Sequence, residues 1–272
     1  MERLAAGSMS LPRVGLGTWR LKGESGQKAV ESALALGYRH IDTAEMYGNE
    51  EAVGAAVTAS GVPRHEIHLT SKVWWSNLAP AAIGSAIRAS LGKLRTDYVD
   101  LYLIHWPSPE MDLPAALGAM VRLREQGLAR AIGVANFPLR LLQAAVEQIR
   151  APIACVQVEY HALLDQSKLV EYTQARGIPI VAYCPLAQGR LAENATLAKI
   201  AAKHDTSPTT VALAWLLGQK GVGAIPKSAN PERQKANLAA ADLTLDAQDL
   251  ASIAQLPKNV RCVSPSFAPT WD

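Results

Sequence analysis

Short apolar runs alternate with helix-like segments along most of this 272-residue chain. Uninterrupted apolar runs are typical of parallel strands that are buried on both faces, and repeated strand–helix alternation indicates a parallel sheet covered by helices. The helix-like segments are 26–36, 50–60, 81–94, 114–126, 138–149, 166–176 and 208–218. We predict strands that begin at Tyr38, His68, Asp100, Ala129, Ile153, Ile178 and Ala224, with an eighth strand that the pattern does not place.

This alternation favours a (β/α)8 TIM barrel, an α/β fold that commonly runs to about 250 residues as one domain. The rival is a doubly wound open sheet, which normally carries a G-x-G-x-x-G motif after its first strand. Gly15-Leu16-Gly17 and Gly221-Val222-Gly223 both lack the third glycine of that motif. No Pro/Ser-rich linker interrupts the chain, so we predict a single barrel domain over residues 1–272.

Five of the apolar runs end on a polar residue, and the five residues are chemically different. They are Asp42, Lys72, His105, Asn136 and Gln157. Catalytic groups of barrel enzymes lie at the carboxyl ends of the strands, on one face of the barrel. One such residue alone is more often a helix cap or a satisfied polar group, but five in corresponding positions predict an active-site rim.

Composition excludes several other functions. The formal net charge is +3, and the Lys and Arg residues do not cluster in a stripe. We therefore do not expect the protein to bind nucleic acid. No apolar stretch reaches the length of a membrane span, and Met1–Pro12 lacks the features of a signal peptide. We therefore expect a cytoplasmic protein that does not bind membranes.

Metal ligation is also unexpected. The three cysteines, Cys155, Cys184 and Cys262, form no C-x-x-C pair and are expected to be structural thiols. His65 and His68 form an H-x-x-H pair with no further ligands nearby in the sequence, and we predict no metal site.

Tyr47 follows Asp42 by five residues and is a candidate proton donor. A tyrosine pKa near 10 is high for acid catalysis at neutral pH, but a unit charge at about 4 Å is worth roughly 4 kcal/mol at an effective dielectric constant of about 20. We predict that Lys72 lowers the pKa of Tyr47, that Asp42 keeps Lys72 charged, and that a neutral His105 orients a substrate carbonyl. A structural ion pair with a half-buried tyrosine and a core histidine would explain the same four residues one by one.

Three separate motifs resemble those of the aldo-keto reductases. They are Gly37–Ala44 followed by Tyr47, Leu91–Leu101 leading to His105-Trp106-Pro107, and Ile225–Ser228. The resemblance implies a barrel enzyme that reduces carbonyl compounds with NADPH, and a catalytic tetrad of Tyr47, Asp42, Lys72 and His105. Within the family, Val263–Pro265 and Ala268–Asp272 are most similar to bacterial 2,5-diketo-gluconate and methylglyoxal reductases.

The same resemblance implies how the cofactor is bound. Asn136 and Gln157 would hold the nicotinamide carboxamide, and Tyr183 would stack on the nicotinamide ring. The residues expected at the adenosine end are Lys227, Ser228 and Arg233 on the 2′-phosphate and Asn237 on the adenine. The sequence departs from the family pattern at Ala135, Cys184 and Ala162, and the first departure puts cofactor affinity in doubt.

Four tryptophans are expected to line the substrate site, namely Trp19, Trp74, Trp106 and Trp271. The short stretch after Val263–Pro265 predicts an open, shallow pocket, suited to small aldehydes, α-oxoaldehydes or keto-sugar acids, in a monomeric enzyme. One alternative is a nicotinamide-binding redox sensor with little turnover. Another is a barrel enzyme that uses residues 227–233 to bind a phosphorylated substrate.

Overall fold

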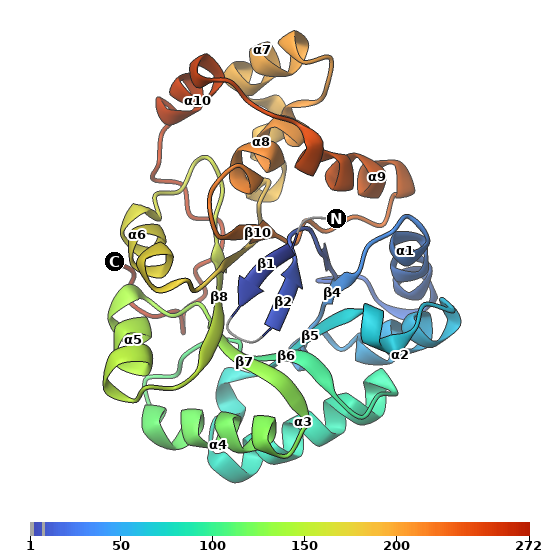
Figure 1. Cartoon of the computed structure of the whole chain (residues 1–272), viewed down its shortest axis with the longest axis vertical. Coiled ribbons are helices and arrows are strands. Elements are labelled where there is room, and N and C mark those ends of the chain that lie inside the picture. The colour runs from blue at the N-terminus through green and yellow to red at the C-terminus, as the bar shows by residue number, and fades with distance from the viewer. Residues whose placement is uncertain (1–2, 7–8) are drawn as a thin grey trace.

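The computed structural model describes residues 3–6 and 9–272, and its main feature is a ring of eight parallel strands (Figure 1). The strands are β3 (Leu16–Gly17), β4 (His40–Asp42), β5 (His68–Val73), β6 (Val99–Ile104), β7 (Ala129–Ala135), β8 (Ile153–Glu159), β9 (Ile180–Tyr183) and β10 (Val222–Ala224). Each strand pairs with the next one along the chain, and a parallel bridge between Val14 and Ala224 joins the two ends of the sheet. The (β/α)8 barrel is therefore confirmed.

Helices surround the strands, as Figure 1 shows. They are α1 (Gly23–Ala35), α2 (Glu50–Ala59), α3 (Pro80–Leu94), α4 (Leu113–Glu125), α5 (Leu139–Gln143), α6 (Ser167–Arg176), α7 (Ala195–Lys203), α8 (Pro208–Leu217), α9 (Pro231–Ala239) and α10 (Ala247–Ala254). Every predicted helical segment contains a helix, although 138–149 is α5 followed by a π-helical turn at Ala144–Gln148. α7, α9 and α10 are additional to the seven predicted segments, and among the described residues no helix is long and apolar enough to cross a membrane.

The strand that the sequence did not place is β3, the first of the barrel. With two residues, this strand is too short to form an apolar run, and it is recognisable only by its parallel pairing with β4. Asp42 therefore ends the second barrel strand rather than the first. The strand expected to begin at Ala224 instead ends there, after starting at Val222, and the strands expected at Tyr38 and Ile178 each begin two residues later.

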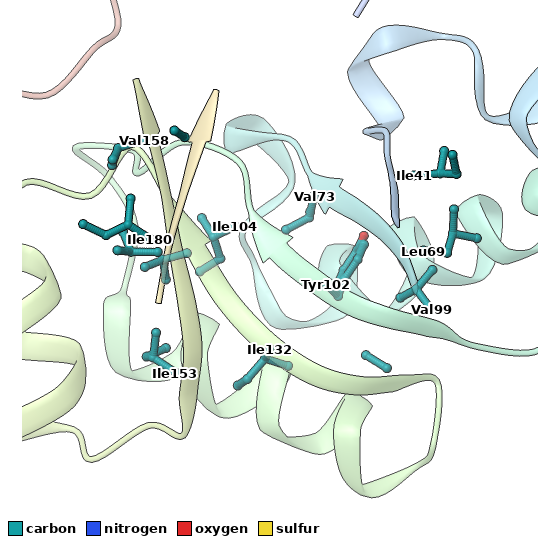
Figure 2. Packing of buried hydrophobic residues seen from close by; sticks show 14 of the residues in the cluster. Ile41, Leu69, Val73, Val99, Tyr102, Ile104, Ile132, Ile153, Val158 and Ile180 are labelled. Carbon is teal, nitrogen blue, oxygen red and sulfur yellow. The ribbon is translucent and has the colours of Figure 1, made fainter. Parts of the chain in front are cut away.

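The two faces of the strands build two different cores. Outward-facing side chains such as Ile41, Leu69, Tyr102 and Ile132 pack with the surrounding helices (Figure 2). The barrel interior is a second cluster, in which Leu101, Leu103 and Val181 meet Leu4 and Leu11.

Leu4 and Leu11 belong to an amino-terminal hairpin of β1 (Arg3–Ala6) and β2 (Met9–Pro12), which the sequence analysis did not predict. Figure 1 shows this hairpin across the middle of the strand ring. Arg13 next to it donates to the Val222 carbonyl at the start of β10, so the hairpin closes the end of the barrel where the strands begin. The opposite end, where the polar residues lie, stays available for a site.

Two histidines are buried beside this hairpin. The rings of His40 and His68 lie 4.9 Å apart, and His40 Nε2 is 3.2 Å from Thr70 Oγ1. Burial lowers the pKa of His40 to about 4, and burial likewise holds the pKa of His68 well below its ordinary value. Both side chains are therefore neutral in the folded protein at neutral pH.

We expect these histidines to make the fold acid-sensitive. Because the unfolded chain takes up protons at an ordinary histidine pKa of about 6.5, the free energy of unfolding should be highest above that pH and fall as the pH drops toward 4. Urea denaturation at several pH values measures this slope. His68→Met should flatten it, whereas His65→Ala, at an exposed position, should not. An unchanged slope in the His68 variant would contradict this explanation.

Candidate active site

The end of β4 and the end of β5 bring Asp42 and Lys72 together. Both side chains are almost completely buried, with exposed fractions of 1% and 0%. Lys72 Nζ donates to Asp42 Oδ1 and, at 2.8 Å, to the Thr43 carbonyl. Burial lowers the pKa of Lys72, but the Asp42 carboxylate and Tyr47 together more than offset this and the pKa is raised overall. Lys72 is therefore a buried ammonium group, as the sequence predicted.

Tyr47 lies beside this pair, at the end of a short 3-10 helix (Glu45–Tyr47). The Lys72 ammonium is 5.1 Å from the centre of the Tyr47 ring. Burial raises the pKa of Tyr47, Lys72 lowers it and Asp42 raises it further, so the net pKa lies above the ordinary value. The expectation that one lysine brings this pKa down was wrong, because the sequence does not reveal how completely the ring is desolvated. The phenol is thus a protonated donor at neutral pH.

His105 follows β6 directly and faces Tyr47. Its ring is 5.5 Å from the Tyr47 ring and 5.1 Å from the Trp74 ring, in edge-on arrangements. Burial, helped by Lys72, holds the pKa of His105 well below its ordinary value, so the ring is neutral as predicted. In the described part of the chain His105 Nδ1 has no hydrogen-bond partner, and the imidazole is therefore not committed to a structural network.

The amides of Asn136 and Gln157 extend this cluster onto the next two strands. Gln157 Nε2 donates to Asp42 Oδ2 at 2.7 Å, and Asn136 Nδ2 donates to the His105 carbonyl at 2.9 Å. Asn136 has a left-handed backbone, with φ of 60°, and directly follows β7. Gln157 lies within β8 rather than at its end, because that strand continues to Glu159.

Tyr183 completes the row on β9. Its hydroxyl donates to Asn136 Oδ1 at 2.6 Å, which fixes the ring beside the two amides. Amides that offer both donors and acceptors suit a carboxamide, and a partly exposed aromatic ring suits a flat heterocycle, so these residues are chemically matched to a nicotinamide.

The residues expected to bind the adenosine end lie around the loop from β10 to α9. Lys227 and Arg233 are exposed, whereas Ser228 and Asn237 are buried. Asn230 caps α9 by accepting from the Arg233 backbone N–H at 3.0 Å, and Ser228 Oγ accepts from the Asn230 N–H. Two cations near a helix amino terminus favour an anion.

Two of the four predicted tryptophans contact residues of the catalytic cluster. Trp19 packs on Tyr47 with ring centres 4.9 Å apart, and Trp74 packs on His105. Trp106 contacts the fourth, Trp271, at 6.0 Å. The structure thus gathers all four around the same mouth of the barrel.

Phe267 is a neighbour that the sequence analysis missed. Its ring stacks on Trp75 at 5.1 Å and contacts Trp74 and Trp106 at 5.5 and 5.6 Å. No local pattern marks Phe267, because it lies in an irregular carboxyl-terminal segment whose path depends on tertiary contacts. Glu159 was missed as well, although its position two residues after Gln157 on the same strand places both on the inner face of the barrel.

Comparison with known proteins agrees with this arrangement. The profile of the Aldo/keto reductase family matches residues 13–258. The chain belongs to this family. It is an oxidoreductase of the nicotinamide-dependent kind.

Individual relatives cover nearly the whole chain. "Methylglyoxal reductase DkgB" of Escherichia coli O157:H7 is 45% identical over 97% of this chain and 100% of its own length. An "Aldo-keto reductase" of Mycobacterium sp. (strain KMS) is 42% identical over 93% of this chain and 91% of its own. A crystal structure of a candidate 2,5-diketo-D-gluconic acid reductase B superposes with a TM-score of 0.95 at 37% identity, covering 100% of this chain and 98% of the other.

Proposed function

We propose that this enzyme uses NADPH to reduce small aldehydes, α-oxoaldehydes or keto-sugar acids to alcohols. The observation that carries the proposal is the contact of a protonated Tyr47 with a buried ammonium, Lys72, and a neutral imidazole, His105. The relatives named for methylglyoxal and diketo-gluconic acid support small polar dicarbonyls as the substrate class.

Each member of the tetrad has a distinct task in this proposal. Bound nicotinamide supplies the hydride. Tyr47 gives its proton to the carbonyl oxygen, and Lys72 stabilises the phenolate that remains. Asp42 keeps Lys72 charged, and His105 donates a hydrogen bond that orients the carbonyl oxygen toward the Tyr47 hydroxyl.

The cofactor residues divide into two groups. Asn136, Gln157 and Tyr183 would hold the nicotinamide, because their amides and ring form one row beside Asp42 and His105. At the other end, Lys227, Ser228 and Arg233 would bind the 2′-phosphate, and Asn237 would reach the adenine.

The first test is a panel of carbonyl compounds, with NADPH consumption followed by absorbance. Turnover of methylglyoxal or a keto-sugar acid supports the proposal. NADPH that binds without turnover would indicate a redox sensor instead. If NADPH neither binds nor reacts, the 227–233 region would belong to a phosphorylated substrate.

Arg233→Ala tests the choice between the two nicotinamide cofactors. A charge-assisted hydrogen bond to a 2′-phosphate is available only with NADPH. The variant should therefore lower the affinity for NADPH by about tenfold or more and leave the affinity for NADH almost unchanged. Lys235→Ala, an exposed cation on the same helix, is the matched control. Fluorescence titration with both cofactors measures the effect, and equal losses for NADPH and NADH would refute the assignment.

We also propose that the enzyme works as a monomer in the cytoplasm. All four residues of the proposed tetrad come from one chain, so no second copy is needed to complete the site. Sedimentation of the purified protein tests the monomer.

A further inference from the structure

The carboxylate of Glu159 is completely buried and belongs to no step of the proposed reaction. Its Oε1 accepts from His161 Nε2 at 2.9 Å and from the Cys262 backbone N–H at 2.6 Å, and its Oε2 accepts from the Val263 N–H at 2.8 Å. Burial raises the pKa of Glu159, but these donors outweigh burial and the pKa is lowered overall. Glu159 is therefore an ionised acceptor at neutral pH.

The tautomer of His161 follows from its surroundings. Nδ1 accepts from the Leu163 N–H at 3.3 Å, so Nε2 carries a ring proton, which it donates to Glu159. In the described part of the chain, Glu159, His161 and Cys262 also form a group of potential metal ligands within 4.8 Å of one another. Because the imidazole nitrogens and both carboxylate oxygens already have partners, hydrogen bonding accounts for this cluster. We therefore interpret Glu159 as a structural anchor for the backbone at Cys262 and Val263.

This anchor holds the start of the segment that carries Phe267. The rings of Phe267, Trp74 and Trp106 form an aromatic wall of the site. After Cys262 and Val263, the chain leads to Phe267, whose ring contacts those of Trp74 and Trp106. Trp74 in turn contacts the His105 ring at 5.1 Å, and Trp106 directly follows His105 in the chain.

The rest of this segment is anchored near the surface. Asp272 accepts a hydrogen bond from the Leu139 N–H at the start of α5, and Trp271 Nε1 donates one to Ser264 Oγ at 3.2 Å. Both hydrogen bonds are exposed to solvent. Glu159 thus supplies the buried anchor of the segment, and it does so from β8, two residues beyond Gln157.

We infer that Glu159 is a positioning residue that fixes the aromatic wall over the substrate carbonyl and thereby sets the affinity for the carbonyl substrate. This inference rests on the proposed function. An acceptor carboxylate that binds two consecutive backbone N–H groups fixes the backbone of residues 262–263 relative to β8, and thereby the start of the segment that leads to Phe267. Without it, Phe267 loses its fixed distance from Trp74 and Trp106, and the wall no longer excludes water from a small substrate.

Glu159→Gln is the direct test, because the amide keeps the shape but replaces one acceptor oxygen by a donor that faces an N–H group. The KM for methylglyoxal should rise about tenfold, while kcat and the Kd for NADPH stay near those of the unaltered enzyme. Glu147→Gln, which removes the negative charge of an exposed ion pair with Arg176, is the control and should change none of these three constants.

Phe267→Ala shows whether Glu159 acts through the wall. Phe267→Ala alone should raise KM, and Glu159→Gln added to it should raise KM little further, because coupled residues are not additive. Independent, additive effects on KM would overturn the inference, and so would an unchanged KM in Glu159→Gln or an equal loss of NADPH affinity.

Should Glu159→Gln fail to fold, His161→Gln removes the imidazole group that donates to Glu159 Oε1 and is expected to give the same split between KM and kcat. An unaltered enzyme that consumes no NADPH with any carbonyl compound would instead refute the proposed function itself. The two failures are therefore distinguishable.

Discussion

Tyr47→Phe is expected to bind NADPH normally and to lose about 10³-fold or more in kcat. The substitution keeps the ring that packs on Trp19 and His105 and removes only the hydroxyl group. Because burial raises the pKa of Tyr47, this hydroxyl is protonated throughout the neutral range, and its ring lies beside the Lys72 ammonium.

The measurement is a pair of experiments on the same variant. Fluorescence titration gives the NADPH affinity, and single-turnover kinetics with methylglyoxal gives the rate of the chemical step. Tyr98→Phe, which removes a phenol hydroxyl just before the start of β6, at the end of the barrel opposite the site, is the matched control and should retain turnover. An active Tyr47→Phe enzyme would mean that His105 or water supplies the proton.

The positions of the candidate site residues were more predictable from sequence than the exact bounds of the helices and strands. The reason is that these residues recur at the ends of successive strands. Asp42, Lys72, His105 and Asn136 each follow or nearly end a buried strand, and parallel pairing of successive strands then brings those ends together. The order of the residues along the chain therefore becomes their order around the rim.

Short or irregular elements were not predicted, because tertiary contacts rather than a local sequence pattern define them. β3 has two residues, so it is defined by its neighbours rather than by its own composition. The hairpin of β1 and β2 is stabilised by Leu4 and Leu11 inside the barrel, and those contacts are invisible along the chain. Phe267 likewise gains its place through Trp74, Trp75 and Trp106, all far away in sequence.

The pKa of Tyr47 shows a different limit. The sequence supplied the sign of the Lys72 contribution, which does lower this pKa, but it could not supply the depth of burial, which raises the pKa by more. Proximity of charges can be inferred from strand order, whereas desolvation depends on every residue that packs around the ring.

Lys72→Met should have the second largest effect, and it should act on both activity and stability. The buried Asp42 carboxylate would keep its hydrogen bond from Gln157 but lose its ammonium partner. Breaking one side of a buried ion pair costs about 3–5 kcal/mol of unfolding free energy. Loss of the charge that stabilises the Tyr47 phenolate should also lower kcat by about 10²-fold or more.

The double variant Lys72→Met with Asp42→Asn separates these two roles. It buries no isolated charge, and the amide oxygen introduced by Asp42→Asn could still accept from Gln157, so urea denaturation should show most of the lost stability restored. The kcat should stay low, because the ammonium is still missing. In the single variant Lys72→Met, which keeps the Asp42 carboxylate, the alkaline limb of the residual activity should also move to higher pH, because Lys72 lowers the pKa of Tyr47. Recovery of kcat together with stability would show that Lys72 is a scaffold for the site and takes no part in proton transfer.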